Sequence, residues 1–133
     1  MTVSQSLHVV PSQFTVAHLP HATFPEDDEW IALVRAPEGL TVVRDASPYT
    51  EAQRWIGFYG ETAHSLDTPG MLAAVVGPLA DAGISVFVAS TYHADLVLVP
   101  EHSYRDAADA LRAAGHRVGD AGVRDGRGAS GAR

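Results

Sequence analysis

The stretch from residue 67 to residue 86 constrains the fold of this chain more than any other segment. It opens with Asp67-Thr68-Pro69-Gly70-Met71, a turn in which proline suits the first helical position and glycine lets other backbone come close. Gly83 stands where a helix C-cap needs a positive φ, and an apolar run begins at Ile84. Between turn and glycine, apolar residues recur at i, i+3, i+4 and i+7, at Leu72, Val75, Val76 and Leu79. The pattern predicts a helix over residues 70–82 followed at once by a strand.

Strand and helix patterns flank this stretch on both sides. Residues 54–60 are aromatic and alternating, which is typical of a strand. Residues 84–92 and 94–99 form two further β-like runs, and the short His93-Ala94 join between them predicts an antiparallel hairpin. Residues 102–114 carry a second helical pattern, and residues 116–118 read as a short last strand. Because both helical patterns are amphipathic, we expect the two helices on one face of an antiparallel sheet.

The order Asp-x-Pro-Gly-apolar-Leu, ten-residue helix and Ala-Gly-Ile-Ser-Val resembles the opening half of an ACT domain, a small-molecule-sensing module. Residues 90–99, Ser-Thr-Tyr-His-Ala-Asp-Leu-Val-Leu-Val, resemble a hairpin found in one ACT branch. That branch contains small bacterial proteins and the arginine-sensing CASTOR proteins of animals. The resemblance implies an α+β fold, a ferredoxin-like βαββαβ ACT domain over residues 49–118.

The branch also has a degenerate, helix-poor ACT-like half, and residues 1–48 fit that description. They contain β-like runs separated by turns, at residues 7–10, 13–19, 30–35 and 40–44. The branch signature acidic-acidic-Leu-Ser-Val-Val corresponds to residues 38–43, with Gly39 in place of an acidic residue and Thr41 in place of serine. The remaining residues, 119–133, are rich in glycine and charge, which predicts a disordered tail.

Composition excludes several classes of function. The chain has no cysteine, which removes disulfides, iron–sulfur clusters and thiolate zinc sites. A net charge of −7 opposes non-specific nucleic-acid binding, which needs a basic footprint. No apolar run approaches the roughly 18 residues of a membrane span, and no signal-peptide pattern opens the chain. We therefore expect a cytoplasmic protein that binds neither membrane nor nucleic acid.

The candidate ligand site combines three segments. The turn has two readings from its residues alone: an ordinary capped helix start, or an anion site at free backbone N–H groups. Hydroxyls and the hairpin aspartate could likewise contact a ligand or satisfy local backbone. The resemblance implies ligand contact, with backbone of the first half facing the turn. The expected ligand-binding residues are Asp67, Pro69, Gly70 and Met71 in the turn, Ser90, Thr91 and Asp95 in the hairpin, and Thr41 and Val42.

Metal and catalytic patterns are weak. His93 and Asp95 are two residues apart, on one face of a regular strand, but none of the other histidines forms an HxH or HExxH pattern with them. Residues 64–67 read His-Ser-Leu-Asp, yet neighbours in a loop do not make a triad, and no GxSxG elbow occurs. The expectation is no metal site, no cofactor and no catalysis, with a small metal-dependent hydrolase as a distant alternative.

Together these features predict a non-catalytic regulatory protein. A free amino acid would bind in a crevice between the two ACT-like halves or between subunits, and stabilise one association state. We expect a homodimer, because the edges of so small a sheet need covering, and an unidentified regulated protein as partner. The alternative, from another class, is a structural or assembly protein that has the ACT fold and no ligand.

Overall fold

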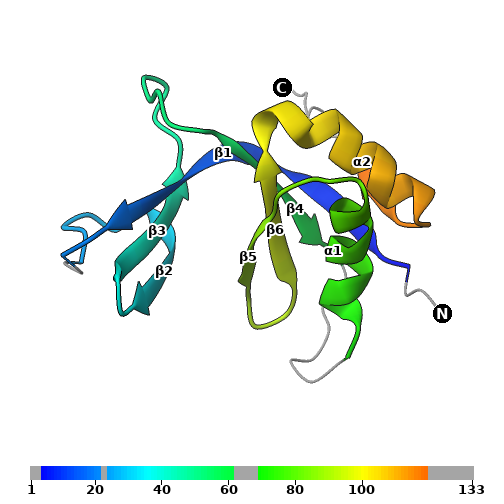
Figure 1. Cartoon of the computed structure of the whole chain (residues 1–133), viewed down its shortest axis with the longest axis horizontal. Coiled ribbons are helices and arrows are strands. Elements are labelled where there is room, and N and C mark those ends of the chain that lie inside the picture. The colour runs from blue at the N-terminus through cyan, green and yellow to red at the C-terminus, as the bar shows by residue number, and fades with distance from the viewer. Residues whose placement is uncertain (1–3, 22–23, 62–68, 120–133) are drawn as a thin grey trace.

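The computed structural model describes residues 4–21, 24–61 and 69–119, which form one seven-stranded sheet and two α-helices (Figure 1). The sheet order is β2-β3-β1-β4-β6-β5, and β7 pairs with β1. All described pairings are antiparallel except that of β1 with β7, so the predicted α+β class is confirmed. The elements are β1 (Ser6–Leu19), β2 (Trp30–Ala36), β3 (Gly39–Asp45), β4 (Trp55–Gly60), α1 (Met71–Asp81), β5 (Phe87–Ser90), β6 (Asp95–Pro100), the 3-10 turn η1 (Glu101–Ser103), α2 (Tyr104–Ala113) and β7 (Arg117–Gly119).

Strand β1 pairs with three other strands. Residues 6–8 pair with β7, residues 7–14 with β4 around an irregularity, and residues 14–19 with β3. The sequence predicts two strands here, interrupted at Pro11, but the structure has one strand of 14 residues with a register shift between Val9 and Gln13. A proline cannot donate to the ladder, so the irregularity accommodates it without ending the strand.

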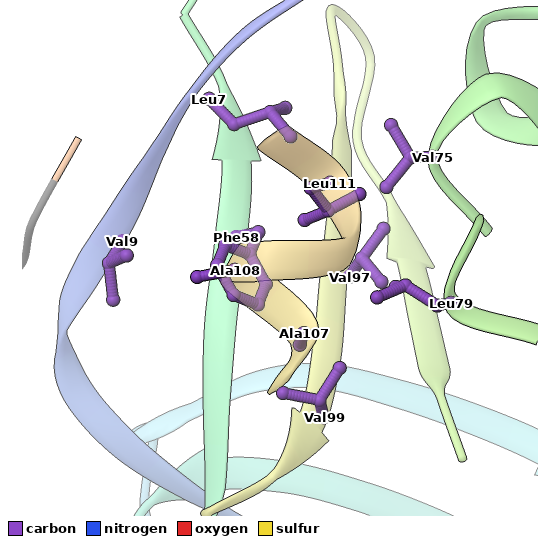
Figure 2. Packing of buried hydrophobic residues seen from close by; sticks show 10 residues of the cluster. All are labelled: Leu7, Val9, Phe58, Val75, Leu79, Val97, Val99, Ala107, Ala108 and Leu111. Carbon is purple, nitrogen blue, oxygen red and sulfur yellow. The ribbon is translucent and has the colours of Figure 1, made fainter. Parts of the chain in front are cut away.

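Both helices pack on the same face of the sheet, as predicted. In Figure 2 the side chains of α1 and α2 meet those of β1, β4 and β6 in one cluster. Leu79 of α1, Leu111 of α2 and Phe58 of β4 are fully buried at its centre. The helical pattern at residues 72–79 therefore marks the core face of α1. The cluster comprises Leu7, Val9, Phe58, Val75, Leu79, Val97, Val99, Ala107, Ala108 and Leu111.

The ends of several elements differ from the predicted ones. Strand β5 begins at Phe87 and not at the predicted Ile84. The N–H of Ile84 donates to Leu79 O of α1 at 2.9 Å, so this residue still belongs to the end of the helix. Beyond β5, the side chain and backbone of Thr91 bond with Ala94, so the hairpin turn takes residues 91–94. The predicted helix over 102–114 begins later, at Tyr104, after the 3-10 turn. Gly83 has a φ of 76°, which confirms its predicted role after the first helix, and Gly115, with a φ of 98°, has the same role after α2.

The first 48 residues and the rest of the chain contribute to the same sheet. Strand β1 lies between β7 and β4, the last and first strands of the predicted βαββαβ unit, and its Leu7 and Val9 enter the helix-side core. The β2–β3 pair extends from the far part of β1, away from the helices (Figure 1). The division at residues 48/49 stays a prediction, and residues 120–133 lie outside the described ranges.

Candidate functional site

The start of α1 is open on the side of β1. Gly70 precedes the helix in the left-handed conformation (φ 83°), and among the described residues no side chain caps the helix and no acid stands in its first turn. The carbonyl oxygen of Met71 accepts a hydrogen bond of 2.7 Å from the side chain of Gln5. The first N–H groups of a helix have no partner within the helix, and such groups can bind an anion.

A cavity of about 230 Å³ lies beside this helix start, and we call it the α1-start cavity. Its basic residue is Arg117 of β7, whose Nε and Nη2 donate to Ser6 Oγ at 3.0 and 2.7 Å. No carboxylate among the described residues lies within 4.0 Å of that guanidinium. The positive charge of the guanidinium and the nearby serine hydroxyls are groups that can hydrogen-bond to a carboxylate. The lining residues are Ser4, Gln5, Ser6, Gly60, Met71, Gly115 and Arg117.

A buried histidine ties three segments around this cavity. His116 is 4% exposed, and its Nδ1 accepts a hydrogen bond of 3.1 Å from the backbone N–H of Gln5. Its Nε2 lies 2.7 Å from the carbonyl oxygen of Ala74 in α1. Because a carbonyl only accepts and an N–H only donates, the ring carries its proton on Nε2 and is neutral. His116 therefore fixes α1 against the start of β1.

A second cavity, of about 420 Å³, lies on the other face of the sheet, and we call it the sheet-face groove. Successive residues of a strand point to opposite faces, so Tyr59 and Leu96 face the groove while Phe58 and Val97 enter the helix-side core. The hydroxyls of Tyr59 and Thr91 are hydrogen-bonded at 2.9 Å. The groove is lined by Val10, Ser12, Phe14, Ile31, Ala32, Asp45, Tyr59, Ala89, Ser90, Thr91 and Leu96.

The predicted site residues fall in three places in this single chain. Met71 lines the α1-start cavity, with Gly70 and Pro69 just before it, both exposed. Asp67 lies outside the described residues. Ser90 and Thr91 line the sheet-face groove, and Ser90 donates to Asp95 Oδ1 at 2.6 Å.

The third predicted segment is in β3. Thr41 is half-buried and Val42 is buried, and neither lines either of these two cavities. Thr41 pairs with His18 of β1 and Val34 of β2, in the part of the sheet farthest from α1. Within one chain, the turn residue Met71 and the hairpin residues Ser90 and Thr91 therefore line two separate cavities. Gly60 lines the first cavity and its neighbour Tyr59 lines the second, so the cavities lie on opposite faces of β4. The nine-residue ligand set stays a prediction.

Four residues at these sites were missing from the sequence-based set: Ser6, Asp45, His116 and Arg117. Ser6 and Arg117 meet because β7 pairs in parallel with β1, 111 residues away along the chain. No local pattern signals that pairing. His116 had one usable signal, its position directly after the glycine that ends α2, where the chain must turn back into the core.

No three His, Cys, Asp or Glu side chains among the described residues are grouped so that they could hold a metal ion. None of the helices in the described ranges is both long and apolar enough to cross a membrane.

Comparisons with known proteins agree with this architecture. Residues 51–113, which run from before β4 to the end of α2, match the family model of the ACT domain. The chain has no significant match among curated proteins. It is similar in structure to protein Atu0741 from Agrobacterium tumefaciens, with a TM-score of 0.76, 23% identity, and coverage of 90% of this chain and 95% of that one.

A second solved structure extends the comparison. VC0802 from Vibrio cholerae, described as a protein of unknown function and possible transport protein, has a TM-score of 0.68 and 26% identity. That match covers 81% of this chain and 87% of VC0802. Residues 51–113, the α+β segment that matches the ACT domain, contribute one wall of the α1-start cavity and one wall of the sheet-face groove.

Proposed function

We propose that this protein is a non-catalytic regulatory protein that binds a free amino acid in the α1-start cavity. The match of residues 51–113 to the ACT domain supports a small-molecule-binding role. The observation that carries the proposal is Arg117, a cavity-lining cation held by Ser6 with no carboxylate partner among the described residues.

The cavity offers complementary groups to both ends of a zwitterion. Arg117 and the first N–H groups of α1 suit a carboxylate, because charge-assisted hydrogen bonds to an anion are the strong ones. Both lone pairs of Ser6 Oγ accept from Arg117, so Ser4 Oγ is the hydroxyl oxygen of the described lining that suits an ammonium group. Asp67, seven residues after Gly60 in the chain, is the predicted carboxylate partner for that ammonium and lies outside the described residues.

Regulation follows if the ligand binds two arrangements of the protein with different affinity. The cavity joins the start of β1, the start of α1 and the strand β7, so an occupant contacts three elements that His116 already links. The proposal also includes a degenerate ACT-like half before residue 49, a homodimer and an unidentified regulated protein. The effector shifts the equilibrium only by its difference in affinity for the two states.

A thermal-shift screen with each of the twenty amino acids tests the binding. A ligand at 100 times its Kd stabilises the folded state by about 2.7 kcal/mol, which is a clear shift for a domain of this size. Arg117→Gln should reduce the shift by at least about half, whereas Arg105→Gln, which removes an exposed cation of α2, should leave it unchanged. No shift with any amino acid rejects the sensing role.

The assembly alternative rests on a different observation. Strands β2, β5 and β7 each pair with one other strand, so each has one unpaired edge in the described residues. Exposed edges invite pairing with another chain. Sedimentation of the protein with and without amino acids distinguishes the two: a dimer that forms identically under all conditions, with no thermal shift, supports assembly alone.

A further inference from the structure

The sheet-face groove lies between two parts of the molecule that leave the central strands in different directions. Ile31, Ala32 and Asp45 line it from β2 and β3, and Ala89 and Leu96 line it from the β5–β6 hairpin. In the sheet, the β2–β3 pair lies on one side of β1 and β4, and the β5–β6 pair lies on the other (Figure 1). Neither helix lines the groove, because both pack on the opposite face.

The lining of the groove is mostly apolar. Six of the eleven lining residues are aliphatic or phenylalanine, and Ile31 is 43% exposed at its rim. A second hydrophobic cluster lies on this face of the sheet and comprises Phe14, Val43, Leu96 and Leu98. Val10, Ala32 and Ala89 of the groove lining pack against it. A cavity of about 420 Å³ is within the usual size of small-molecule sites, roughly 300–1,000 Å³, which combine an apolar lining with a few polar groups.

The polar side chains of the groove are four hydroxyls and one carboxylate. Among the described residues that line it, Asp45 alone is charged, and its carboxylate makes no hydrogen bond or ion pair with any of the described residues. The hydroxyls of Ser12, Ser90, Tyr59 and Thr91 complete the polar set. The described lining contains no arginine, lysine or histidine, so the one charge that a negatively charged ligand would meet in it is a like charge.

We propose that the sheet-face groove binds a small molecule with an apolar body and a primary ammonium group. The apolar body lies on Phe14, Ala89 and Leu96, and the ammonium donates to the Asp45 carboxylate. This site is separate from the α1-start cavity and does not depend on the function proposed for that cavity. The two sites select opposite charges: Arg117 selects a carboxylate, and Asp45 selects a cation.

Calorimetry with three probes of similar size tests the charge requirement. 2-Phenylethylamine has an aromatic body and an ammonium group, 2-phenylethanol is its neutral counterpart, and 3-phenylpropanoate is anionic. The amine should bind at least about tenfold more tightly than either of the others, since a charge-assisted hydrogen bond is lost in both. Equal binding of the amine and the alcohol, or no heat with the amine at millimolar concentration, overturns the proposal.

Matched variants locate the site. Asp45→Asn should weaken amine binding by about 10- to 100-fold. Asp28→Asn removes the same charge from an exposed position outside the groove and should have no effect. Ala89→Leu fills the groove and should abolish binding, while Ala80→Leu on the exposed side of α1 should not.

Amide NMR spectra provide a second readout that a merely structural effect does not reproduce. The amine should shift the signals of β5 and of the β2–β3 pair, and Arg117→Gln should leave those shifts unchanged. Shifts centred on Met71 and Arg117 instead would place the amine in the α1-start cavity and contradict the assignment. A second copy of the chain seated on the groove, detected as a dimer that the amine does not dissociate, would also contradict it.

Discussion

His116, just after the end of α2, is hydrogen-bonded to Ala74 in the first turn of α1: the imidazole Nε2–H donates to the Ala74 carbonyl oxygen at 2.7 Å. The ring is nearly inaccessible to solvent, at 4% exposure, and its other nitrogen accepts from Gln5 N. A buried polar side chain with both of its hydrogen-bonding atoms satisfied specifies one arrangement of the elements it links. His116 therefore helps to hold α1 beside the start of β1, together with the hydrogen bond from the Gln5 side chain to Met71 O.

Replacing that residue tests its structural role. His116→Leu keeps an apolar filling but leaves the N–H of Gln5 and the carbonyl of Ala74 without their partner, which costs about 1–3 kcal/mol for a buried unsatisfied group. His18→Leu changes an exposed histidine of β1 and should alter the free energy of unfolding by less than about 0.5 kcal/mol. Urea unfolding measures both. A His116→Leu loss no larger than that of the control would show that the bridge does not stabilise the fold.

Two glycine-to-alanine changes should have opposite signs. A Cβ on Gly57, in the buried centre of β4, would lie 2.9 Å from Leu96 Cδ1 and 3.3 Å from Phe14 Cε2. Gly57→Ala should therefore destabilise by about 1–3 kcal/mol through overpacking. For a Cβ on Gly119 of β7 the nearest described atom is Leu7 O, at 3.9 Å, and alanine loses less backbone entropy in a strand than glycine, so Gly119→Ala should stabilise by about 0.5–1 kcal/mol. Thermal unfolding of both variants decides, and the same sign for the two would contradict the packing.

Asp27 should titrate below its ordinary value. The backbone N–H of Glu29 donates to its carboxylate at 3.0 Å and lowers the pKa of Asp27 from 3.8, and Arg44, at 3.1 Å, adds to the effect. A folded-state pKa below the unfolded one means that the carboxylate favours folding above about pH 3.8, and that this contribution is lost as the pH falls through the folded-state pKa.

An NMR titration of the Asp27 carboxyl carbon measures that pKa directly. The midpoint should lie below 3.8 in the wild type and move upward in Arg44→Gln without reaching 3.8, because the contact with Glu29 remains. The side chain is exposed, so the effect on unfolding should be small. A wild-type midpoint at or above 3.8 would contradict the observed contacts.

Periodic segments of this chain were predictable because local patterns determine them. The spacing of Val75 and Leu79 marks the buried side of α1, and Gly83 marks its end. The single long β1 was not predictable from Pro11, because the pairing of the strand with β4 on both sides of the proline outweighs the local breaking signal. Tertiary pairing decides strand ends, and sequence spacing does not report it.

The candidate sites were predictable only where they coincide with a local motif. Met71, Ser90 and Thr91 line cavities, and each belongs to a turn that the sequence marks with glycine or hydroxyl residues. Arg117 and Asp45 were missed because their sites are built by strands that meet across the sheet. The pairing of β7 with β1 brings Arg117 to its cavity, and the pairing of β3 with β1 brings Asp45 to the groove.

Isothermal titration calorimetry with the free amino acids and Arg117→Gln tests the central claim most directly. The wild type should bind at least one of the twenty amino acids, and the carboxamide of that amino acid, which lacks the carboxylate, should bind far more weakly. Arg117→Gln should reduce affinity for the free amino acid by about 1.5–3 kcal/mol, the value of a charge-assisted hydrogen bond, with Arg105→Gln unchanged. Equal affinity of the wild type and Arg117→Gln, or of the amino acid and its amide, would contradict the account.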